Sequence, residues 1–179
     1  MSGAIETEVK LRVAGPEKAR AALVRLGAER VRVRHFEDNV IYDDGSSSLV
    51  RGGRLLRLRR TDAGGVLTYK GPRRDREGMK SRPELETAVP DPDALQAILQ
   101  ALGYRAVFRY QKYREVYRWK EVEIVVDEMP IGCFLEIEGA AAGIHEAAAA
   151  LGYSPADYLQ DSYAALFFAG GGQGDMTFK

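Results

Sequence analysis

Apolar and charged residues alternate along much of this chain, and the alternation predicts that most of it is β-strand. From residue 5 to residue 13, every second residue is Ile, Thr, Val or Leu, and every residue between them is Glu, Lys or Arg. Neighbouring side chains of a strand point to opposite faces, so this segment has one charged face. Eight segments are predicted to be strands, most of them by this alternation: 5–13, 36–43, 54–60, 66–71, 80–89, 110–119, 122–128 and 134–138.

Helix signals are few and short. The segment 16–26 starts with Pro16, which suits the first turn of a helix, and Gly27 follows its last residue. The length of 179 residues fits one domain, which we place at residues 1–169, and the glycine-rich residues 170–179 are expected to be a flexible tail. Four segments are predicted to be helices: 16–26, 93–102, 144–151 and 155–168.

A weak internal repeat suggests that the chain has two related halves. One Glu-X-Glu strand at residues 6–8 and another at residues 84–86 are each followed by a predicted helix that ends in Leu-Gly. Each half would then run as a strand, a helix and further strands, and the two halves would close on each other.

The composition excludes several classes of protein. Lys and Arg together number 26, as do Asp and Glu, so the net charge of zero argues against a nucleic-acid duplex as partner. A single cysteine excludes an intramolecular disulfide framework. The sequence has no run of 18 apolar residues and no apolar signal core, so we expect no membrane partner and a cytoplasmic location.

The charged faces carry most of the functional information. On seven of the predicted strands almost every polar position is a charged residue, whereas the alternative, a solvent-exposed sheet face, usually mixes charges with uncharged polar residues. The apolar faces must pack on the few helices, so the charged faces of a closed or cupped sheet would point at one another. We therefore expect an α+β fold, a closed eight-stranded antiparallel β-barrel with a charged interior and helices outside.

The charges that share a face point to phosphate chemistry. Arg and Lys at this density favour a polyanion such as phosphate, and clustered carboxylates favour Mg²⁺ or Mn²⁺. Phosphate held by cations and metal ions is a phosphoryl-transfer site, and the sequence has no GxxxxGK[ST] loop for the P-loop alternative. The cations in phase are Lys10, Arg57, Arg59, Lys70, Arg82, Lys112 and Arg114, and the anions in phase are Glu6, Glu8, Glu84, Glu86, Glu123, Asp127, Glu136 and Glu138.

The order of these motifs resembles the CYTH domain, or triphosphate tunnel metalloenzyme family, which includes class IV adenylyl cyclases, thiamine triphosphatases and inorganic triphosphatases. Glu6-Thr-Glu8-Val-Lys10 is similar to the Glu-X-Glu-X-Lys signature of the first strand. The resemblance covers about residues 5–167. The other similar segments are HFEDNVIYD at 35–43, LRLR at 56–59, TYKGP at 68–72, RPELE at 82–86, KYREVY at 112–117 and VDEMPIGCFLEIEG at 126–139.

The resemblance implies a tunnel open at both ends that holds a small-molecule triphosphate and, in two sites, Mg²⁺ or Mn²⁺. It implies substrate-binding roles for Lys10, Arg57, Arg59, Lys70, Arg82, Lys112 and Arg114. It implies metal-ligand roles for Glu6, Glu8, Asp127, Glu136 and Glu138. It implies catalytic roles for Lys10 and for Glu84 and Glu86, which would position a water or the hydration shell of a metal ion.

Residues outside the similar motifs are interpreted as structural. Glu123 is in phase without matching a motif, and we expect it to pair with an arginine of the barrel. His35 is interpreted as a loop or core residue, and Cys133 as a small buried apolar residue. Family members of this size can dimerise, so a homodimer stays open.

Three functions stay open at this stage. We favour hydrolysis of a triphosphate, either inorganic or organic, such as thiamine triphosphate or a nucleotide. The alternative is a class IV adenylyl cyclase, in which the ribose 3′-hydroxyl attacks the α-phosphate of ATP and pyrophosphate leaves. KYREVY looks closer to the cyclase and thiamine triphosphatase branches, but residues 1–4 lack the longer His-Phe lead-in of cyclases. The third function is a non-catalytic polyphosphate-binding module, which could lose the carboxylates.

Overall fold

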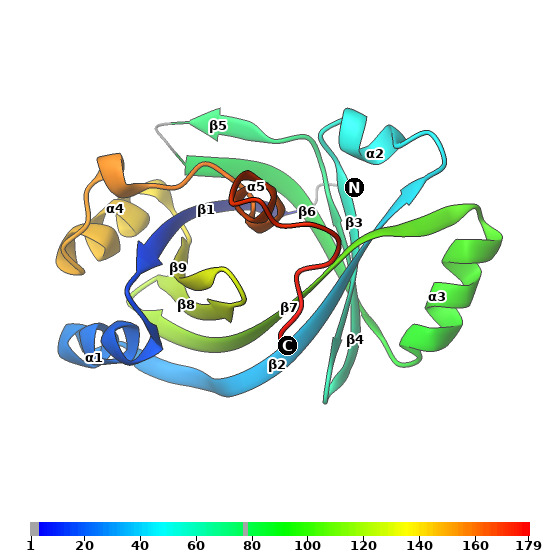
Figure 1. The fold of residues 1–179 in the computed structure, drawn as a ribbon. Helices are drawn as coiled ribbons and strands as arrows, with labels where there is room; N and C mark the ends of the chain where they lie inside the picture. Colours follow the sequence, from blue (N-terminus) through cyan, green and yellow to red (C-terminus); the bar gives the residue numbers. More distant parts are fainter. Residues whose placement is uncertain (1–3, 77–78) are drawn as a thin grey trace.

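A computed structural model describes residues 4–76 and 79–179 of the chain and confirms the predicted α+β barrel. In these residues, eight antiparallel strands follow the order β1-β9-β8-β7-β2-β3-β4-β6 (Figure 1). Strand β1 pairs with β6 and so closes the barrel. The short strand β5 pairs with the beginning of β6. The strands are β1 (Ala4–Val13), β2 (Glu29–Asp44), β3 (Leu55–Thr61), β4 (Gly64–Lys70), β5 (Arg74–Arg76), β6 (Met79–Val89), β7 (Tyr104–Trp119), β8 (Val122–Met129) and β9 (Gly132–Glu138).

The helices lie outside the barrel or across one of its ends (Figure 1). The predicted helix 16–26 is confirmed with the same bounds, and Gly27 ends it in the left-handed conformation that glycine adopts without strain. None of the helices in the described part of the chain has the length and apolar character needed to span a bilayer. The helices are α1 (Pro16–Leu26), α2 (Ser48–Arg51), α3 (Pro92–Ala101), α4 (Ala141–Ala150), a 3₁₀ turn (Pro155–Asp157) and α5 (Tyr163–Ala169).

The prediction of one helix over residues 155–168 is wrong. The 3₁₀ turn ends at Asp157, and the chain then crosses the end of β1, where the Leu159 amide donates to the Lys10 carbonyl over 2.8 Å. The Ser162 side chain accepts from a backbone amide of α5 and starts a new helix. Pairing of this segment with β1 therefore outweighs its local helix preference.

The two related halves that the repeat suggested are confirmed in the strand order. The first half runs β1, α1, β2, the short helix α2, β3 and β4, and the second runs β6, α3, β7, β8 and β9. The first strands of the halves, β1 and β6, pair with each other, and so do the long strands β2 and β7. Two more strand pairs, β1–β9 and β4–β6, also join the halves, so the halves meet at four places around the barrel.

The apolar core lies between the outer faces of the strands and the helices. Leu11, Ile124 and Ile137 point outward from β1, β8 and β9 and pack against Leu23 of α1 and Ile144 of α4, and all five are fully buried. Smaller clusters lie beneath α3 and beneath α5. With the apolar faces turned to the helices, the charged faces are left to point into the barrel, as predicted.

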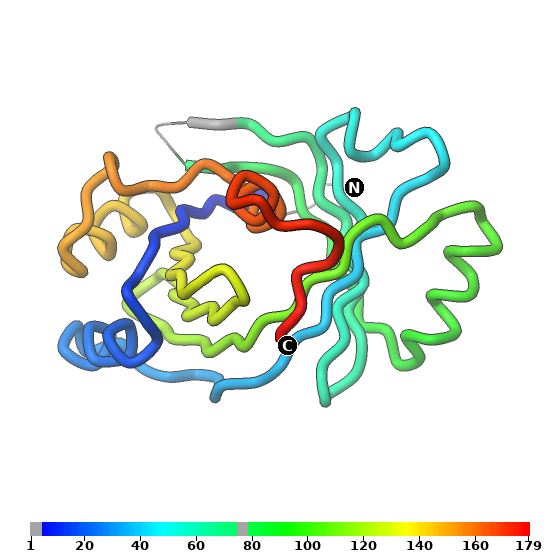
Figure 2. The backbone as a smooth tube through the Cα atoms, viewed as in Figure 1, coloured from blue at the N-terminus to red at the C-terminus, as the bar shows by residue number. Residues whose placement is uncertain are grey.

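The C-terminal segment runs beside β7 (Figure 2). Met176 is fully buried, its amide donates to the Arg109 carbonyl over 2.9 Å, and its carbonyl accepts from the Gln111 amide over 3.0 Å. The Met176 side chain packs in the cluster beneath α5 with Phe108 and Tyr110. The expected flexibility of residues 170–179 stays a prediction, as does the extent of the single domain.

Candidate active site

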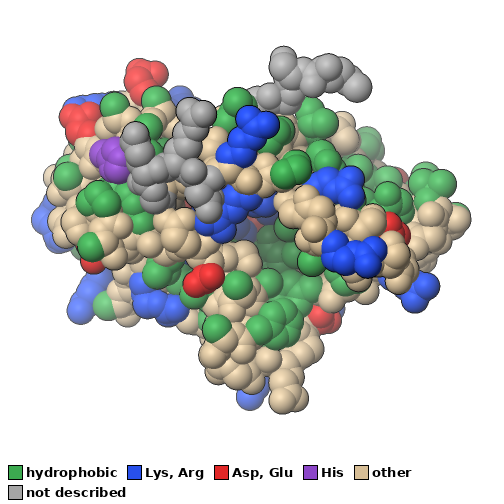
Figure 3. Space-filling view, turned by 90° about the horizontal axis from the view of Figure 1, so that it is seen from above, with side chains coloured by type: hydrophobic (Ala, Val, Ile, Leu, Met, Phe, Trp, Pro, Cys, Tyr) green, Lys and Arg blue, Asp and Glu red, His purple; other side chains and the backbone are tan. Residues whose placement is uncertain are grey.

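A cavity of about 500 Å³ lies inside the barrel and is lined by charged side chains from β1, β3, β4, β6, β7, β8 and β9. Figure 3 shows Lys and Arg side chains gathered around a hollow in the face of the molecule seen from above. Every predicted site residue except Asp127 lines this cavity. The lining cations are Lys10, Arg57, Arg59, Lys70, Lys80, Arg82, Lys112 and Arg114, and the lining carboxylates are Glu6, Glu8, Glu84, Glu86, Glu123, Glu136 and Glu138.

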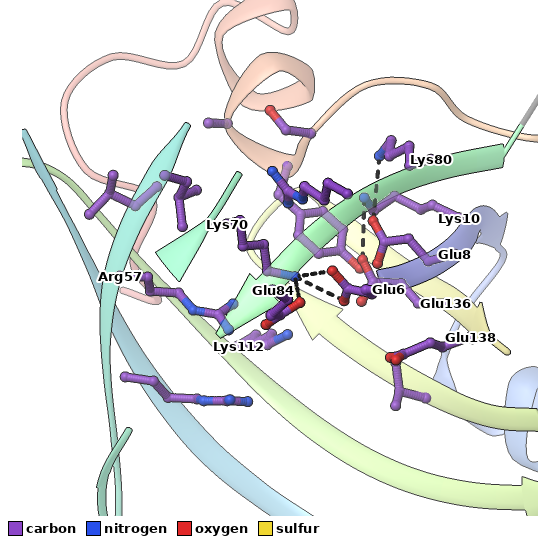
Figure 4. Close-up of a pocket in the computed structure, with 18 of the residues that line it drawn as sticks. Glu6, Glu8, Lys10, Arg57, Lys70, Lys80, Glu84, Lys112, Glu136 and Glu138 are labelled. Atoms are coloured by element: carbon purple, nitrogen blue, oxygen red, sulfur yellow. Dashed lines mark hydrogen bonds and ion pairs between the residues drawn. The ribbon is translucent and has the colours of Figure 1, made fainter. Parts of the chain in front are cut away.

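Lys70 lies between two of the predicted carboxylates (Figure 4). Its Nζ is 2.6 Å from a Glu6 oxygen and 2.7 Å from a Glu84 oxygen. The strand register explains these contacts. Lys70 on β4 is the direct partner of Glu84 on β6, and β6 also pairs with β1, the strand of Glu6. Burial, followed by the hydrogen bond with Glu84, raises the pKa of Glu6 above its usual value. These ion pairs would have to open for Lys70 to bind a phosphate.

Lys10 and Lys80 converge near the start of α5. Lys10 Nζ lies 3.3 Å from Glu136, and both lysines donate to the Asp161 carbonyl, Lys10 over 3.4 Å and Lys80 over 3.0 Å. Burial, followed by the charge of Lys10, lowers the pKa of Lys80 to about 8, although Glu8 opposes this effect. Lys80 was not among the predicted site residues. Its phase with Arg82 on the same strand was the signal that could have identified it.

Asp127 lies behind the cavity instead of lining it. It is fully buried and accepts two hydrogen bonds from Arg114, over 2.6 and 2.7 Å, and one from Lys112 over 3.0 Å. The Tyr163 hydroxyl of α5 donates to the same carboxylate over 3.0 Å. The structure therefore does not bring Asp127 together with the other predicted metal ligands, and its metal-binding role stays a prediction.

Arg57 and Arg59 of β3 reach past β4 toward Glu86 of β6. The Arg59 Nη2 donates to Glu86 over 3.0 Å, and Thr68 donates to the same oxygen over 2.5 Å. The Arg57 Nη1 donates to the Tyr110 hydroxyl over 3.2 Å. Tyr110 is in phase with Lys112 on β7, so its strand position places it in the tunnel. The arginines thus have partners that a bound anion could replace.

Carboxylates are concentrated on β1, β8 and β9. Glu8 is the register partner of Glu138, and Glu138 is in turn the partner of Glu123. Partial burial, followed by the charges of Glu6 and Glu123, raises the pKa of Glu138 to about 7. Oxygen donors of this kind fit Mg²⁺ or Mn²⁺. Among the described residues, however, no three carboxylate, His or Cys side chains lie close enough together to form a complete ligand set.

Glu37 on β2 is a buried carboxylate that sequence reasoning missed. It contacts Arg59 and Lys112, both predicted to bind substrate, and its oxygen lies 3.4 Å from Nε2 of His35. His35 also contacts the Val33 carbonyl through Nδ1 over 3.0 Å. Glu123 lines the cavity, and no arginine partner for it is seen in the described residues.

The fold and the site define a class, antiparallel barrels that enclose a tunnel of paired Lys, Arg and Glu side chains. The CYTH domain family model matches residues 4–163, and the chain belongs to this family. A protein of Methanocaldococcus jannaschii named “Putative adenylate cyclase” is 29% identical over 143 residues, which cover 79% of this chain and 81% of that protein.

Solved structures share the fold over nearly the whole chain. One from Vibrio parahaemolyticus, named as a “putative adenylate cyclase”, has a TM-score of 0.81 and 23% identity and covers 93% of this chain and 99% of its own. The PH1819 protein of Pyrococcus horikoshii has a TM-score of 0.74 and 26% identity, with 92% and 99% covered. A Hippeastrum protein named “Putative adenylyl cyclase”, described with a dominant triphosphatase activity, has a TM-score of 0.71 and 21% identity, with 92% and 96% covered.

Proposed function

We propose that this protein is an enzyme that binds a triphosphate-bearing small molecule in the tunnel and hydrolyses it with the help of divalent metal ions. The observation that carries the proposal is the lining of one cavity by Lys and Arg side chains from five strands, interleaved with carboxylates. A triphosphate carries several negative charges along a narrow chain, so cations on all sides of a tunnel match it better than they match a single anion. The family membership supports the same substrate class.

The lining residues divide into two roles in this proposal. Arg57, Arg59, Lys70, Arg82, Lys112, Arg114 and Lys10 would bind the phosphate oxygens. Glu6, Glu8, Glu136 and Glu138, with Asp127 as the predicted fifth, would hold Mg²⁺ or Mn²⁺. When bound, such an ion would neutralise charge on the transferring and leaving oxygens.

Glu84 and Glu86 would orient the attacking water, and they come from β6, which only β1 separates from β9 and its Glu136. Lys10 lies at the boundary between the two roles, because its Nζ is 3.3 Å from Glu136. It can therefore contact a phosphate oxygen next to the carboxylates.

Cyclisation of ATP is the second candidate, and the names of the relatives favour it. The Methanocaldococcus protein is named “Putative adenylate cyclase”, whereas the Hippeastrum protein is described with a dominant triphosphatase activity. Both reactions use the same phosphate-binding cations and differ in which phosphorus is attacked. We retain hydrolysis as the first proposal. The cytoplasmic location and the homodimer stay predictions within it.

A product assay separates these reactions. Purified protein with Mg²⁺ or Mn²⁺ is incubated with inorganic triphosphate, ATP and thiamine triphosphate, and orthophosphate, pyrophosphate and cyclic AMP are resolved. Orthophosphate without cyclic AMP supports hydrolysis, and the fastest substrate identifies its type. Cyclic AMP with an equal amount of pyrophosphate would replace hydrolysis with cyclisation. Triphosphate binding without any product would support the polyphosphate-binding module.

The carboxylates distinguish an enzyme from that binding module. We expect the double variant Glu6→Gln, Glu138→Gln to lower kcat by at least about a hundredfold, because it removes the negative charges of two predicted metal ligands. Binding of inorganic triphosphate, measured by calorimetry, should persist, because the cations remain. Glu121→Gln, an exposed change in the turn after β7, is the matched control. Activity equal to that of the wild type in the double variant would contradict the metal-site proposal.

A further inference from the structure

Glu37 lies in the middle of β2 and has no role in the proposed reaction so far. The residue is fully buried, and it does not line the cavity. Its register partner on β7 is Lys112, and the next residue on the same face of β2, Asn39, is the partner of Arg59 on β3. Glu37 therefore lies behind the layer of cations that faces the cavity, at the point where β2 joins β3 and β7.

The contacts of Glu37 are with groups that carry or can carry positive charge. Its Oε1 accepts from Arg59 Nη1 over 3.2 Å and lies 3.4 Å from His35 Nε2, and its Oε2 lies 3.5 Å from Lys112 Nζ. Burial favours the neutral acid, but Lys112, His35, Arg114 and Arg59 together hold the pKa of Glu37 far below its usual value. Glu37 is therefore a permanent anion behind the cations.

Arg59 has a second carboxylate partner, and the two partners differ in exposure. Glu86 accepts from Arg59 over 3.0 Å from within the cavity, and its side chain is 40% exposed, whereas the side chain of Glu37 is 1% exposed. A phosphate that enters the cavity can take the place of Glu86. It cannot reach Glu37, so the contact of Arg59 with Glu37 can persist in the bound state.

Several buried polar atoms around Glu37 have no hydrogen-bond partner, so the attraction between opposite charges is important in fixing Glu37 and Arg59. Among the described residues, the buried side-chain nitrogen and oxygen atoms that lack a hydrogen-bond partner all belong to this region of β2 and β3: Glu37, Asn39, Arg57 and Arg59. The Nε atoms of both arginines are among them. With few hydrogen bonds to fix the arginines from behind, the carboxylate of Glu37 is the restraint on Arg59 that lies on the buried side.

Resting on the proposed function, we propose that Glu37 is a positioning residue that holds Arg59 and Lys112 in the orientation in which both bind the triphosphate. It acts through these two cations and does not touch the substrate. The positioning role and a simple charge effect predict changes of opposite sign in triphosphate affinity. Removing a negative charge close to a bound polyanion would by itself strengthen binding, whereas releasing Arg59 and Lys112 would weaken binding and slow turnover.

The test combines Glu37→Gln with Arg59→Gln, alone and together. The probe is inorganic triphosphate with Mg²⁺, and the measurements are kcat, KM and the calorimetric Kd. We expect Glu37→Gln to lower kcat/KM by about tenfold or more in the wild-type background. In the Arg59→Gln background it should cost at most about threefold, because one of the two cations that it positions is already absent.

Glu115→Gln is the matched control. Glu115 on β7 is also a buried carboxylate held by two arginines, Arg20 over 2.7 Å and Arg30 over 3.1 Å, but it does not line or support the cavity. We expect it to lower the thermal midpoint and to leave kcat/KM within about twofold of the wild type. A general effect of removing a buried carboxylate would instead lower kcat/KM in both variants.

Each outcome supports or overturns the positioning role. Unchanged or tighter binding with unchanged turnover in folded Glu37→Gln would overturn it, and so would costs that simply add in the double variant. If Glu37→Gln does not fold, Glu37→Asp replaces it, because aspartate keeps the charge on a side chain shorter by one methylene. We expect Glu37→Asp to lower kcat/KM less than Glu37→Gln would, and again to have a smaller effect in the Arg59→Gln background. A wild-type protein that binds neither inorganic triphosphate nor ATP would overturn the proposed function itself, and the inference with it.

Discussion

At the scale of single residues, the tunnel places like charges close together on β1, β8 and β9. Partial burial, followed by the carboxylates of Glu6, Glu123 and Glu8, raises the pKa of Glu138 from 4.5 to about 7, although Lys70 opposes the shift. A carboxyl group whose pKa is higher in the folded than in the unfolded protein stabilises the fold below its unfolded pKa. It loses that contribution as the pH rises through the folded pKa.

We therefore expect Glu138→Gln to stabilise the metal-free protein at alkaline pH. The amide is neutral at every pH, so the variant avoids the repulsion that the wild type acquires as Glu138 ionises. Urea midpoints in the presence of a chelator should be higher for the variant at about pH 8.5, and the difference should vanish near pH 5. Glu121→Gln should show no such dependence. Equal midpoints of wild type and Glu138→Gln at pH 8.5 would refute the repulsion argument.

Strand phase predicted the residues that line the tunnel, but it could not show their depth. Asp127 has the predicted phase, yet the pairing of β8 with β7 places it beneath Arg114 and Lys112, away from the cavity. Glu37 was missed because its strand face continues with Asn39 and Ile41 and shows no run of charges. Depth depends on strand tilt and on contacts between distant strands, which alternation does not encode.

At the scale of elements, the C-terminal segment completes the core beneath α5. We expect Met176→Ala to lower the free energy of unfolding by about 2–3 kcal/mol, because a fully buried side chain of this size leaves a cavity when truncated. Denaturant titration measures this value. Phe178→Ala in the same segment should cost less, because Phe178 is 36% exposed. A Met176→Ala variant as stable as the wild type would show that the segment is not packed on β7 in solution.

Elements with strong local signals were predicted well, and those fixed by distant contacts were not. The first helix begins with Pro16 and ends at Gly27, both local signals, and its bounds are confirmed. The break within 155–168 depends on pairing of Leu159 with β1, about 150 residues earlier in the chain. Tyr163 lines the tunnel because the helix breaks before it, so no nearby sequence pattern predicts its position.

At the scale of the whole molecule, the tunnel brings together eight Lys and Arg side chains that a triphosphate can contact. We expect inorganic triphosphate to stabilise the fold by about 2.7 kcal/mol at a hundred times its Kd, since it binds only the closed barrel. For a protein of this length that corresponds to a thermal midpoint about 5–10 °C higher. Raising NaCl to about 0.5 M should reduce the shift at fixed triphosphate by screening the charges.

Arg57→Gln combined with Arg59→Gln is the control for this shift, because it keeps the barrel but removes two lining cations. Its thermal midpoint should respond much less to triphosphate. A shift that neither salt nor this double variant reduces would mean that the anion binds outside the tunnel.

The strand pairs between the halves also govern how the chain folds. The β2–β7 pair cannot form until β7 has been synthesised, nor the β1–β9 pair until β9 has been, so the first half has strand edges without their native partners during translation. Pairings this far apart in sequence require large loops to close first, which slows folding compared with a helical protein of equal length. Exposed strand edges are also sites of misassociation. Exposure of these edges during synthesis therefore follows from enclosing the tunnel with both halves.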